Sequence, residues 1–310
     1  MREYGERPQK SLAKTSAYRG FAGSLLLCFI PPPSAFILLP LPCNELKNFM
    51  SAHVPASSKT PRVPSRTVEI HIRRRANPDS PQYWERFEIP YRPNLNIITC
   101  LMEIQKNPVT KEGNPTTPPV WSMNCLEQVC GICTMVINGR ARQSCSALVD
   151  NLEQPIKLEP MSKFPNVRDL VVDRSRMFDY LKRVHAWIEL DGTHDLGPGP
   201  RMDQEDVQER YAYSRCMTCG CCLEACPQYD DDQYIGPQAI AQVRLFNMHP
   251  TGKMTRDKRL EAIMGDDGIT NCGDSQNCVA ACPMNIPLTR AIYQENRETV
   301  VHGLFGWLKR

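Results

Sequence analysis

The sequence lacks an excess of charge of either sign, and it lacks a long uninterrupted apolar run. It carries 37 Lys and Arg against 34 Asp and Glu, a net charge of +3 over 310 residues. This small excess gives no indication of a dedicated nucleic-acid binder. Three prolines, Pro31 to Pro33, break the apolar residues 21–41 and leave about nine apolar residues before them, too few to cross a bilayer. We therefore predict neither a nucleic-acid partner nor a transmembrane span.

The sequence also lacks a recognisable arrangement of catalytic groups. No Ser-His-Asp set, paired carboxylates or phosphate-binding loop stands out, and the six histidines are scattered without the spacing of metal ligands. We therefore predict no catalytic residues and no substrate-transforming site on this chain. The composition of 41% apolar and 23% charged residues still allows sizeable cores and excludes wholesale disorder.

Residues 1–66 differ from the remainder and form a predicted leader. A weakly basic start precedes the apolar run, but no small-x-small cleavage site follows Ile30 and no twin-arginine pair occurs. Glu3, Glu6 and the proline block argue against a mitochondrial transit peptide. We expect translation to begin at Met50, so that the first 49 residues are an over-extended start, with a flexible Ser/Pro/Lys segment after it.

An α+β fold with two domains is predicted for the remainder. In residues 67–166, strand-like alternation at 68–72 and 87–91 flanks a turn at 77–79, and a helical face spans 97–104. A further strand at 134–137, closed by Asn138-Gly139, completes a small β-grasp-like domain. Residues 167–310 are predicted to be α-helical, with a loop at 192–200 and helices at 167–184, 236–249, 258–264 and 288–301.

The sequence holds 15 cysteines, and their spacing is that of metal ligands rather than of disulfides. The first motif is Cys-x4-Cys-x2-Cys with a later cysteine, the plant-type spacing for a [2Fe–2S] cluster. Gly131 would let the backbone approach that cluster closely. A zinc site is the alternative, although two Cys-x2-Cys knuckles would be more usual for it. The predicted [2Fe–2S] ligands are Cys125, Cys130, Cys133 and Cys145.

Two further motifs end in Cys-Pro and match the bacterial ferredoxin pattern, in which the last cysteine crosses to the other cluster. The crossover assigns a [4Fe–4S] cluster to Cys216, Cys219, Cys222 and Cys282. The other site receives Cys226, Cys272 and Cys278, and Ser275 occupies the position where a fourth cysteine would stand. Three thiolates most simply hold a [3Fe–4S] cluster. Cys221 and Cys100 are predicted to be buried bystanders.

A [2Fe–2S] domain followed by a helical [4Fe–4S]/[3Fe–4S] domain resembles the iron–sulfur subunit of succinate dehydrogenase and fumarate reductase. The resemblance covers about residues 67–310 and includes Arg168-Asp169-Leu170-Val171-Val172-Asp173, Ile235-Gly236-Pro237 and Pro287-Leu288-Thr289. It implies a plant-type β-grasp ferredoxin domain and an α-helical bacterial-ferredoxin-like domain. It also implies a subunit clamped between an FAD-containing flavoprotein and a membrane anchor, with electrons passing from FAD through the three clusters to a quinone.

Two departures from ubiquinone-reducing members favour the menaquinone-linked type with a single dihaem cytochrome b anchor. Gln228 follows Cys226-Pro227 where those members have serine before aromatic residues, and Gly273 stands where they have histidine. The resemblance thus implies FAD and haem b on partner subunits only, and a peripheral position on the cytoplasmic face of a bacterial inner membrane. The apolar residues 303–308 are expected to pack on a partner or at the membrane edge, or else on the chain's own helices.

Three alternatives remain open. The same relay could run in reverse in a fumarate reductase, because sequence does not give direction. The chain could serve another oxidoreductase of the heterodisulfide-reductase or glycolate-oxidase kind, although Ser275 and the attached [2Fe–2S] domain argue against it. From a different class, it could be a zinc-stabilised scaffold without redox activity.

Overall fold

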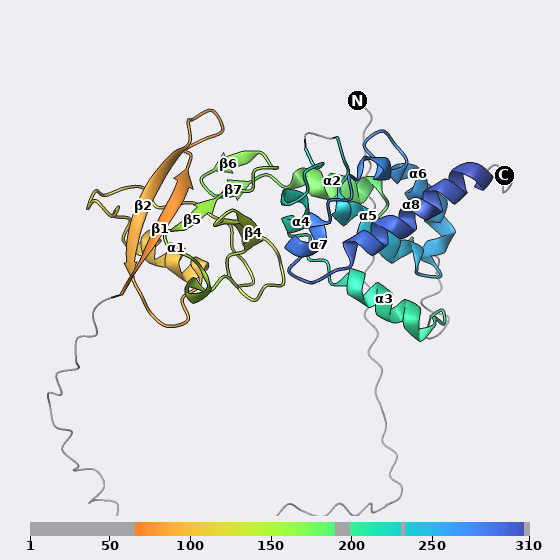
Figure 1. The fold of residues 1–310 in the computed structure, drawn as a ribbon, viewed down its shortest axis with the longest axis horizontal. Coiled ribbons are helices and arrows are strands. Elements are labelled where there is room, and N and C mark those ends of the chain that lie inside the picture. The colour runs from red at the N-terminus through yellow and green to blue at the C-terminus, as the bar shows by residue number, and fades with distance from the viewer. Residues whose placement is uncertain (1–65, 190–198, 231–232, 307–310) are drawn as a thin grey trace, which may run out of the picture. The chain divides into compact units, whose positions relative to one another are not determined.

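The computed structural model describes residues 66–189, 199–230 and 233–306 (Figure 1). Residues 1–65 of the predicted leader, most of the predicted loop at 192–200 and the last two residues of the apolar segment 303–308 lie outside the described residues. Apart from α1, which lies between β2 and β3, the strands precede the α-helices along the described chain, as expected for an α+β fold.

The first part is built on a five-stranded sheet in the order β2-β1-β5-β3-β4. The predicted hairpin pairs β1 (Thr67–Arg74) with β2 (Tyr83–Pro90), and the predicted turn is closed by Ser80 N–H donating to the Asn77 carbonyl at 3.1 Å. β5 (Ile156–Glu159) runs parallel to β1 and links it to the second hairpin, β3 (Thr134–Ile137) and β4 (Arg140–Gln143). The alternating apolar residues of β1 are all buried, as the period of two predicts.

Helix α1 (Ile97–Lys106) covers this sheet with its predicted apolar face. Asn96 caps it by accepting the Thr99 N–H at 2.8 Å, and Ile97, Leu101 and Ile104 are buried in the same core as the strands. A single turn, η1 (Val149–Asn151), lies between β4 and β5. The core of the first part therefore lies between α1 and the sheet.

The prediction of one continuous helix over residues 167–184 is wrong. A small hairpin of β6 (Asn166–Arg168) and β7 (Val171–Val172) comes first, and helix α2 (Ser175–Arg183) begins only afterwards. Asp169 at the turn has a φ of 44°, which a helix cannot accommodate. Its buried carboxylate accepts hydrogen bonds from Arg74 Nε at 2.9 Å and from the backbone of Arg75 and Val120 at 3.0 and 2.9 Å. These contacts outweigh the helical spacing of the apolar residues.

The second part is helical. Helices α5 (Pro237–Asn247), α6 (Arg256–Ile263) and α8 (Leu288–Phe305) confirm three predictions, and α8 continues beyond the predicted end. α3 (Gln204–Ser214), the short α4 (Cys221–Glu224) and α7 (Asn277–Ala281), and the turns η3 (Gly252–Thr255) and η4 (Ile269–Asn271) were not predicted. Within the residues described, no helix has both the length and the apolar character needed to span a bilayer.

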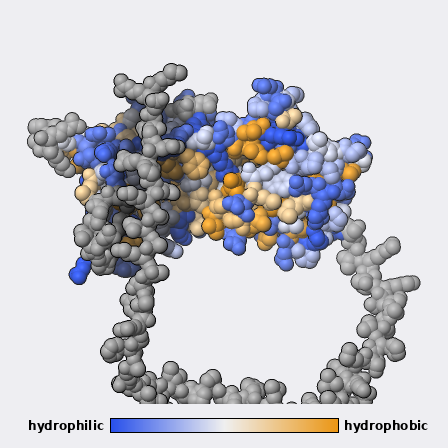
Figure 2. Space-filling view, turned by 180° about the vertical axis from the view of Figure 1, so that it is seen from behind, coloured by the Kyte–Doolittle hydropathy of each residue, from blue (hydrophilic) through white to orange (hydrophobic). Residues whose placement is uncertain are grey.

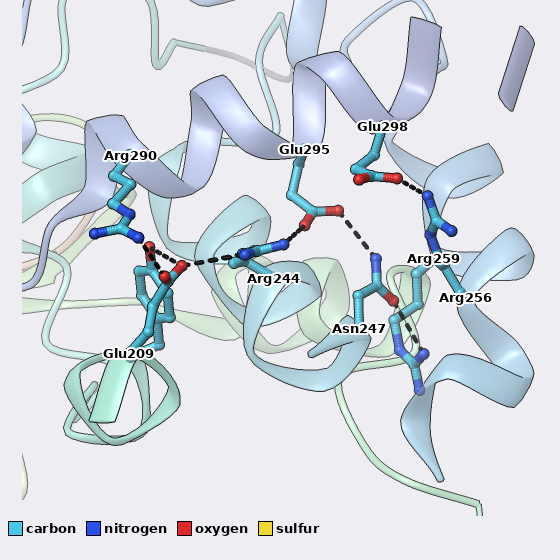
Figure 3. Close-up of polar contacts among 9 residues, drawn as sticks. Glu209, Arg244, Asn247, Arg256, Arg259, Arg290, Glu295 and Glu298 are labelled. Carbon is cyan, nitrogen blue, oxygen red and sulfur yellow. Dashed lines mark hydrogen bonds and ion pairs between the residues drawn. The ribbon is translucent and has the colours of Figure 1, made fainter. Parts of the chain in front are cut away.

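A polar network ties α8 to α5 and α3 (Figure 3). Glu295 is fully buried on α8, where it accepts a hydrogen bond from Asn247 Nδ2 at 2.9 Å and lies 3.7 Å from the Arg244 guanidinium. Burial raises the pKa of Glu295, and the two partners on α5 oppose that shift. Arg244 and Arg290 both pair with Glu209 of α3, at 3.2 and 2.6 Å. The three helices around the cysteine loops are thereby fixed to one another.

Candidate metal centre

The first cysteine motif forms a loop that directs backbone amides at a thiol. The N–H groups of Glu127, Val129 and Cys130 approach Cys125 Sγ at 3.4, 3.4 and 3.3 Å. These amides lower the pKa of Cys125 to about 6, so the loop favours the thiolate that a metal requires. Left-handed conformations at Leu126 and Gln128 curl the loop around the sulfur.

Cys133 and Cys145 lie at the root of the same loop. Cys133 directly precedes β3 and Cys145 follows β4, and Ser144 joins them by donating its N–H and hydroxyl to the Cys133 carbonyl at 3.2 and 2.8 Å. Burial raises the pKa of Cys145 to about 11, and the Cys133 thiol beside it adds to the shift. The hairpin thus brings the second pair of predicted ligands next to the first.

The four cysteines predicted to hold the [4Fe–4S] cluster line one cavity. Cys216 follows α3, Cys219 and Cys222 border the start of α4, and Cys282 ends α7, so the crossover cysteine arrives from 60 residues further along the chain. Met217, Ile286 and Leu288 supply apolar walls. Burial raises the pKa of Cys222, as does the negative charge of Cys219, Cys216 and Cys282.

The three cysteines assigned to the remaining site line a second cavity together with Ser275. Cys226, Cys272 and Cys278 meet there beside Tyr234, whose pKa is raised by burial and by the negative charge of these thiols. Ser275 is exposed and lies between Asp274 and Gln276, both in left-handed conformations with φ values of 51° and 59°. The non-cysteine position therefore lies on the solvent side of the cavity.

The donor set of both cavities suits iron–sulfur clusters. All cysteines in the described part of the chain are free thiols. In the same residues no three His, Cys, Asp or Glu side chains converge closely enough to hold a single metal ion. Thiolates that share a cluster bind different irons, so they do not need to converge on one point.

The two predicted bystanders are buried and lie outside both cavities. Cys100 is buried in α1. Cys221 is 0% exposed, although Cys219 and Cys222 on either side of it line the [4Fe–4S] cavity. Gln143 Nε2 of β4 approaches Cys221 Sγ at 3.6 Å. Cys221 therefore contacts the sheet-bearing part of the chain.

Gly131 brings the loop of the first motif against the loop of the second. A Cβ atom at Gly131 would lie 2.7 Å from Cys219 Cβ and 2.8 Å from Cys219 Cα. Glycine also suits the φ of +68° at this position. The sequence predicted a close backbone approach to a cluster, and the structure adds that the same glycine allows two cluster loops to touch.

We expect Gly131→Ala to lower the stability of the chain more than Gly139→Ala. Both glycines have a positive φ, but a Cβ at Gly139 would meet nothing within 4 Å, so the control carries only the backbone strain. The extra overlap at Gly131 should cost about 1–3 kcal/mol. Thermal unfolding midpoints of the two purified variants measure the difference. Equal midpoints would show that the loops can separate without cost.

Sequence reasoning missed three polar residues at these sites, namely Gln143, Arg174 and Tyr234. Each is a single polar residue without a repeated spacing, so no pattern in the sequence distinguishes it from a surface side chain. Only the fold brings them beside the cysteine loops.

Two family models match the chain in the order of these motifs. A 2Fe-2S iron-sulfur cluster binding domain matches residues 68–179, and a 4Fe-4S dicluster domain matches residues 212–286. A chain of the Mycobacterium smegmatis Sdh1 complex in the apo form has a similar fold, with a TM-score of 0.64 at 22% identity. The similarity covers 76% of this chain and 96% of that one.

Curated relatives are similar over the same region. The succinate dehydrogenase iron-sulfur subunit of Bacillus subtilis is 60% identical over 235 residues, covering 76% of this chain and 93% of that subunit. The fumarate reductase iron-sulfur subunit of Wolinella succinogenes is 29% identical over 225 residues, covering 71% and 91%. The chain belongs to the family of succinate dehydrogenase iron–sulfur subunits.

Proposed function

We propose that this chain is the electron-relay subunit of a succinate dehydrogenase. It takes electrons from an FAD-containing subunit and passes them through three iron–sulfur clusters to a membrane quinone. One observation carries this proposal. Cysteines that are far apart in the sequence come together in two cavities, and a further group of cysteines forms a loop of its own. The identity of 60% to a succinate dehydrogenase subunit, against 29% to a fumarate reductase subunit, favours succinate oxidation over the reverse reaction.

We assign the clusters to the residues that the motifs select. A β-grasp domain over 67–166 holds [2Fe–2S], and a helical domain over 167–310 holds [4Fe–4S] and [3Fe–4S]. Such clusters accept and release one electron at a time, at potentials that depend on cluster type, charge and hydrogen bonding. The chain's own residues exclude water, hold the thiolates and direct amides at sulfur. The assigned ligands are Cys125, Cys130, Cys133 and Cys145, then Cys216, Cys219, Cys222 and Cys282, then Cys226, Cys272 and Cys278.

Exposed apolar side chains support the proposal that partner subunits cover this chain on more than one side. Leu126, Val129 and Ile132 of the first cysteine loop are 49%, 65% and 41% exposed, and Leu304 and Phe305 at the end of α8 are also exposed. On the face drawn in Figure 2, apolar areas occur at more than one place among hydrophilic ones. We assign the first loop to the flavoprotein and the end of α8 to the membrane anchor.

The finer part of the proposal is a menaquinone-linked complex with a haem-bearing cytochrome b anchor, on the cytoplasmic face of a bacterial inner membrane. The two departures from the ubiquinone-reducing pattern support it, and they are neighbours in space. A Cβ at Gly273 would lie 2.5 Å from Gln228 Nε2. The Gln228 side chain therefore fills the space that a larger residue at position 273 would need. A histidine at position 273 would displace Gln228.

Anaerobic addition of succinate to the purified native complex tests this function. We expect the [3Fe–4S] cluster, which accepts an electron more easily than the [4Fe–4S] cluster, to become reduced, as followed by paramagnetic resonance, and a menaquinone analogue to reoxidise it. Malonate, which competes for the dicarboxylate site on the flavoprotein, is the control and should prevent the reduction. A [3Fe–4S] cluster that stays oxidised with succinate but is reduced by dithionite would contradict the proposal.

A further inference from the structure

Arg174 connects the first and second cysteine loops through its guanidinium. Nη1 donates to the carbonyl of Gly131 at 2.8 Å and to that of Cys219 at 3.4 Å. Nη2 donates to the carbonyls of Ile132 and Thr134 at 2.9 and 3.3 Å. One side chain therefore binds the backbone of both loops.

The position of Arg174 is fixed from its own side as well. It is the residue before α2, and Asp173 holds the first turn of that helix by accepting the Ser175 N–H at 2.8 Å. The planar guanidinium has five N–H donors in a rigid fork, which suits several carbonyls at once better than the ammonium group of lysine.

The charge of Arg174 lies against the backbone of both motifs. Gly131 and Ile132, whose carbonyls it binds, stand between Cys130 and Cys133, and its third carbonyl partner belongs to the assigned ligand Cys219 itself. Its four hydrogen bonds go to neutral carbonyls, so the guanidinium has no carboxylate partner among the residues described here. A positive charge that has no carboxylate partner favours added negative charge nearby.

The loops that Arg174 joins are already in contact. The missing side chain of Gly131 allows the approach to Cys219, and Gln143 reaches across to Cys221. Neither of these two contacts carries a formal charge, so of the three contacts between the loops only Arg174 adds one.

We infer that Arg174 is a positioning residue for electron transfer between the first two clusters, acting through the carbonyls of both cysteine loops and through its charge. This inference rests on the proposed function. It goes further in naming one side chain that both fixes the gap between the two sites and makes each easier to reduce. Electron transfer slows steeply as a gap widens, and nearby charge and hydrogen bonds shift cluster potentials.

Three variants of the native complex test it, namely Arg174→Gln, Arg174→Lys and the control Arg183→Gln. Arg183 is the last residue of α2, the helix that Arg174 precedes, and it pairs with Asp267 at 2.7 Å, so its loss removes an equal charge without touching either loop. The readouts are amide deuterium exchange in residues 130–136 and 216–222, and the midpoint potentials of the [2Fe–2S] and [4Fe–4S] resonance signals.

We expect Arg174→Gln to accelerate exchange in both loops roughly tenfold and to shift both potentials downward. Arg174→Lys should accelerate exchange while leaving the potentials near those of the unmodified complex, because it keeps the charge but loses the fork.

If Arg174→Gln behaves like Arg183→Gln in both readouts, the inference is wrong. If Arg174→Gln does not assemble, unchanged exchange in Arg174→Lys would overturn it. Absence of cluster signals from the unmodified complex would instead refute the proposed function, and exchange would still decide the positioning role.

Discussion

Replacing Cys222 by serine is expected to abolish the [4Fe–4S] cluster, whereas replacing the adjacent Cys221 by serine should leave all three clusters in place. Cys222 lines the cavity with three other thiols, while the buried Cys221 lies outside it beside Gln143. A serine hydroxyl holds its proton far more tightly than a thiol and is a poor ligand for iron. The same substitution at neighbouring buried positions thus separates loss of ligation from the general cost of placing a hydroxyl there.

Two measurements test this prediction: the amounts of iron and acid-labile sulfide per chain, and the paramagnetic resonance signal of the reduced [4Fe–4S] cluster. Cys222→Ser should lose that signal and the matching iron and sulfide. Cys221→Ser should keep them, since its hydroxyl can accept the hydrogen bond from Gln143. An equal loss in both variants would indicate that disturbed packing, and not ligation, controls the result.

Replacing Ser275 by cysteine is expected to convert the three-iron site into a four-iron site with a lower potential. Ser275 lines the cavity of Cys226, Cys272 and Cys278, and its exposed position leaves room for iron to reach a new thiolate. A three-iron cluster is all-ferric when oxidised, so adding an electron to it is easier than adding one to a four-iron cluster. Electron transfer to quinone should slow, while succinate oxidation with an acceptor that draws electrons from the flavin should persist.

The oxidised complex provides the readout, because among the three clusters only [3Fe–4S] is paramagnetic in its oxidised state. Ser275→Cys should lose that signal, and the control Ser275→Ala should retain it, since neither serine nor alanine supplies a ligand. A full-strength signal in Ser275→Cys would show that position 275 is not where the fourth ligand belongs.

Much of the first part of the fold could be predicted because one physical signal dominated each element. Burial on one face of a sheet imposes a period of two on β1 and β2, and Asn138-Gly139 is typical of the tight turn between β3 and β4. The predicted helix over 167–184 failed because Asp169 takes a left-handed conformation to bring its carboxylate to Arg74 and two amides. That preference comes from residues distant in sequence, which local periodicity does not register.

The grouping of cysteines into the two cavities could be predicted for a similar reason, since cysteine spacing is a local pattern with a chemical cause. The contacts between the cysteine loops could not. Gly131 against Cys219, Gln143 against Cys221 and Arg174 on both loops all join residues more than 40 positions apart. Short helices such as α4 and α7 were also missed, because two turns or fewer bury too few residues to produce a periodic signal.

The presence of three iron–sulfur clusters in one chain is tested most directly by determining acid-labile sulfide and zinc on the same sample of purified complex. Sulfide is the better measure than iron, because haem in the anchor would add iron but no sulfide. We predict the sulfide content of one [2Fe–2S], one [4Fe–4S] and one [3Fe–4S] cluster per chain, with zinc at background. Stoichiometric zinc without sulfide would contradict the relay and indicate a zinc-stabilised scaffold.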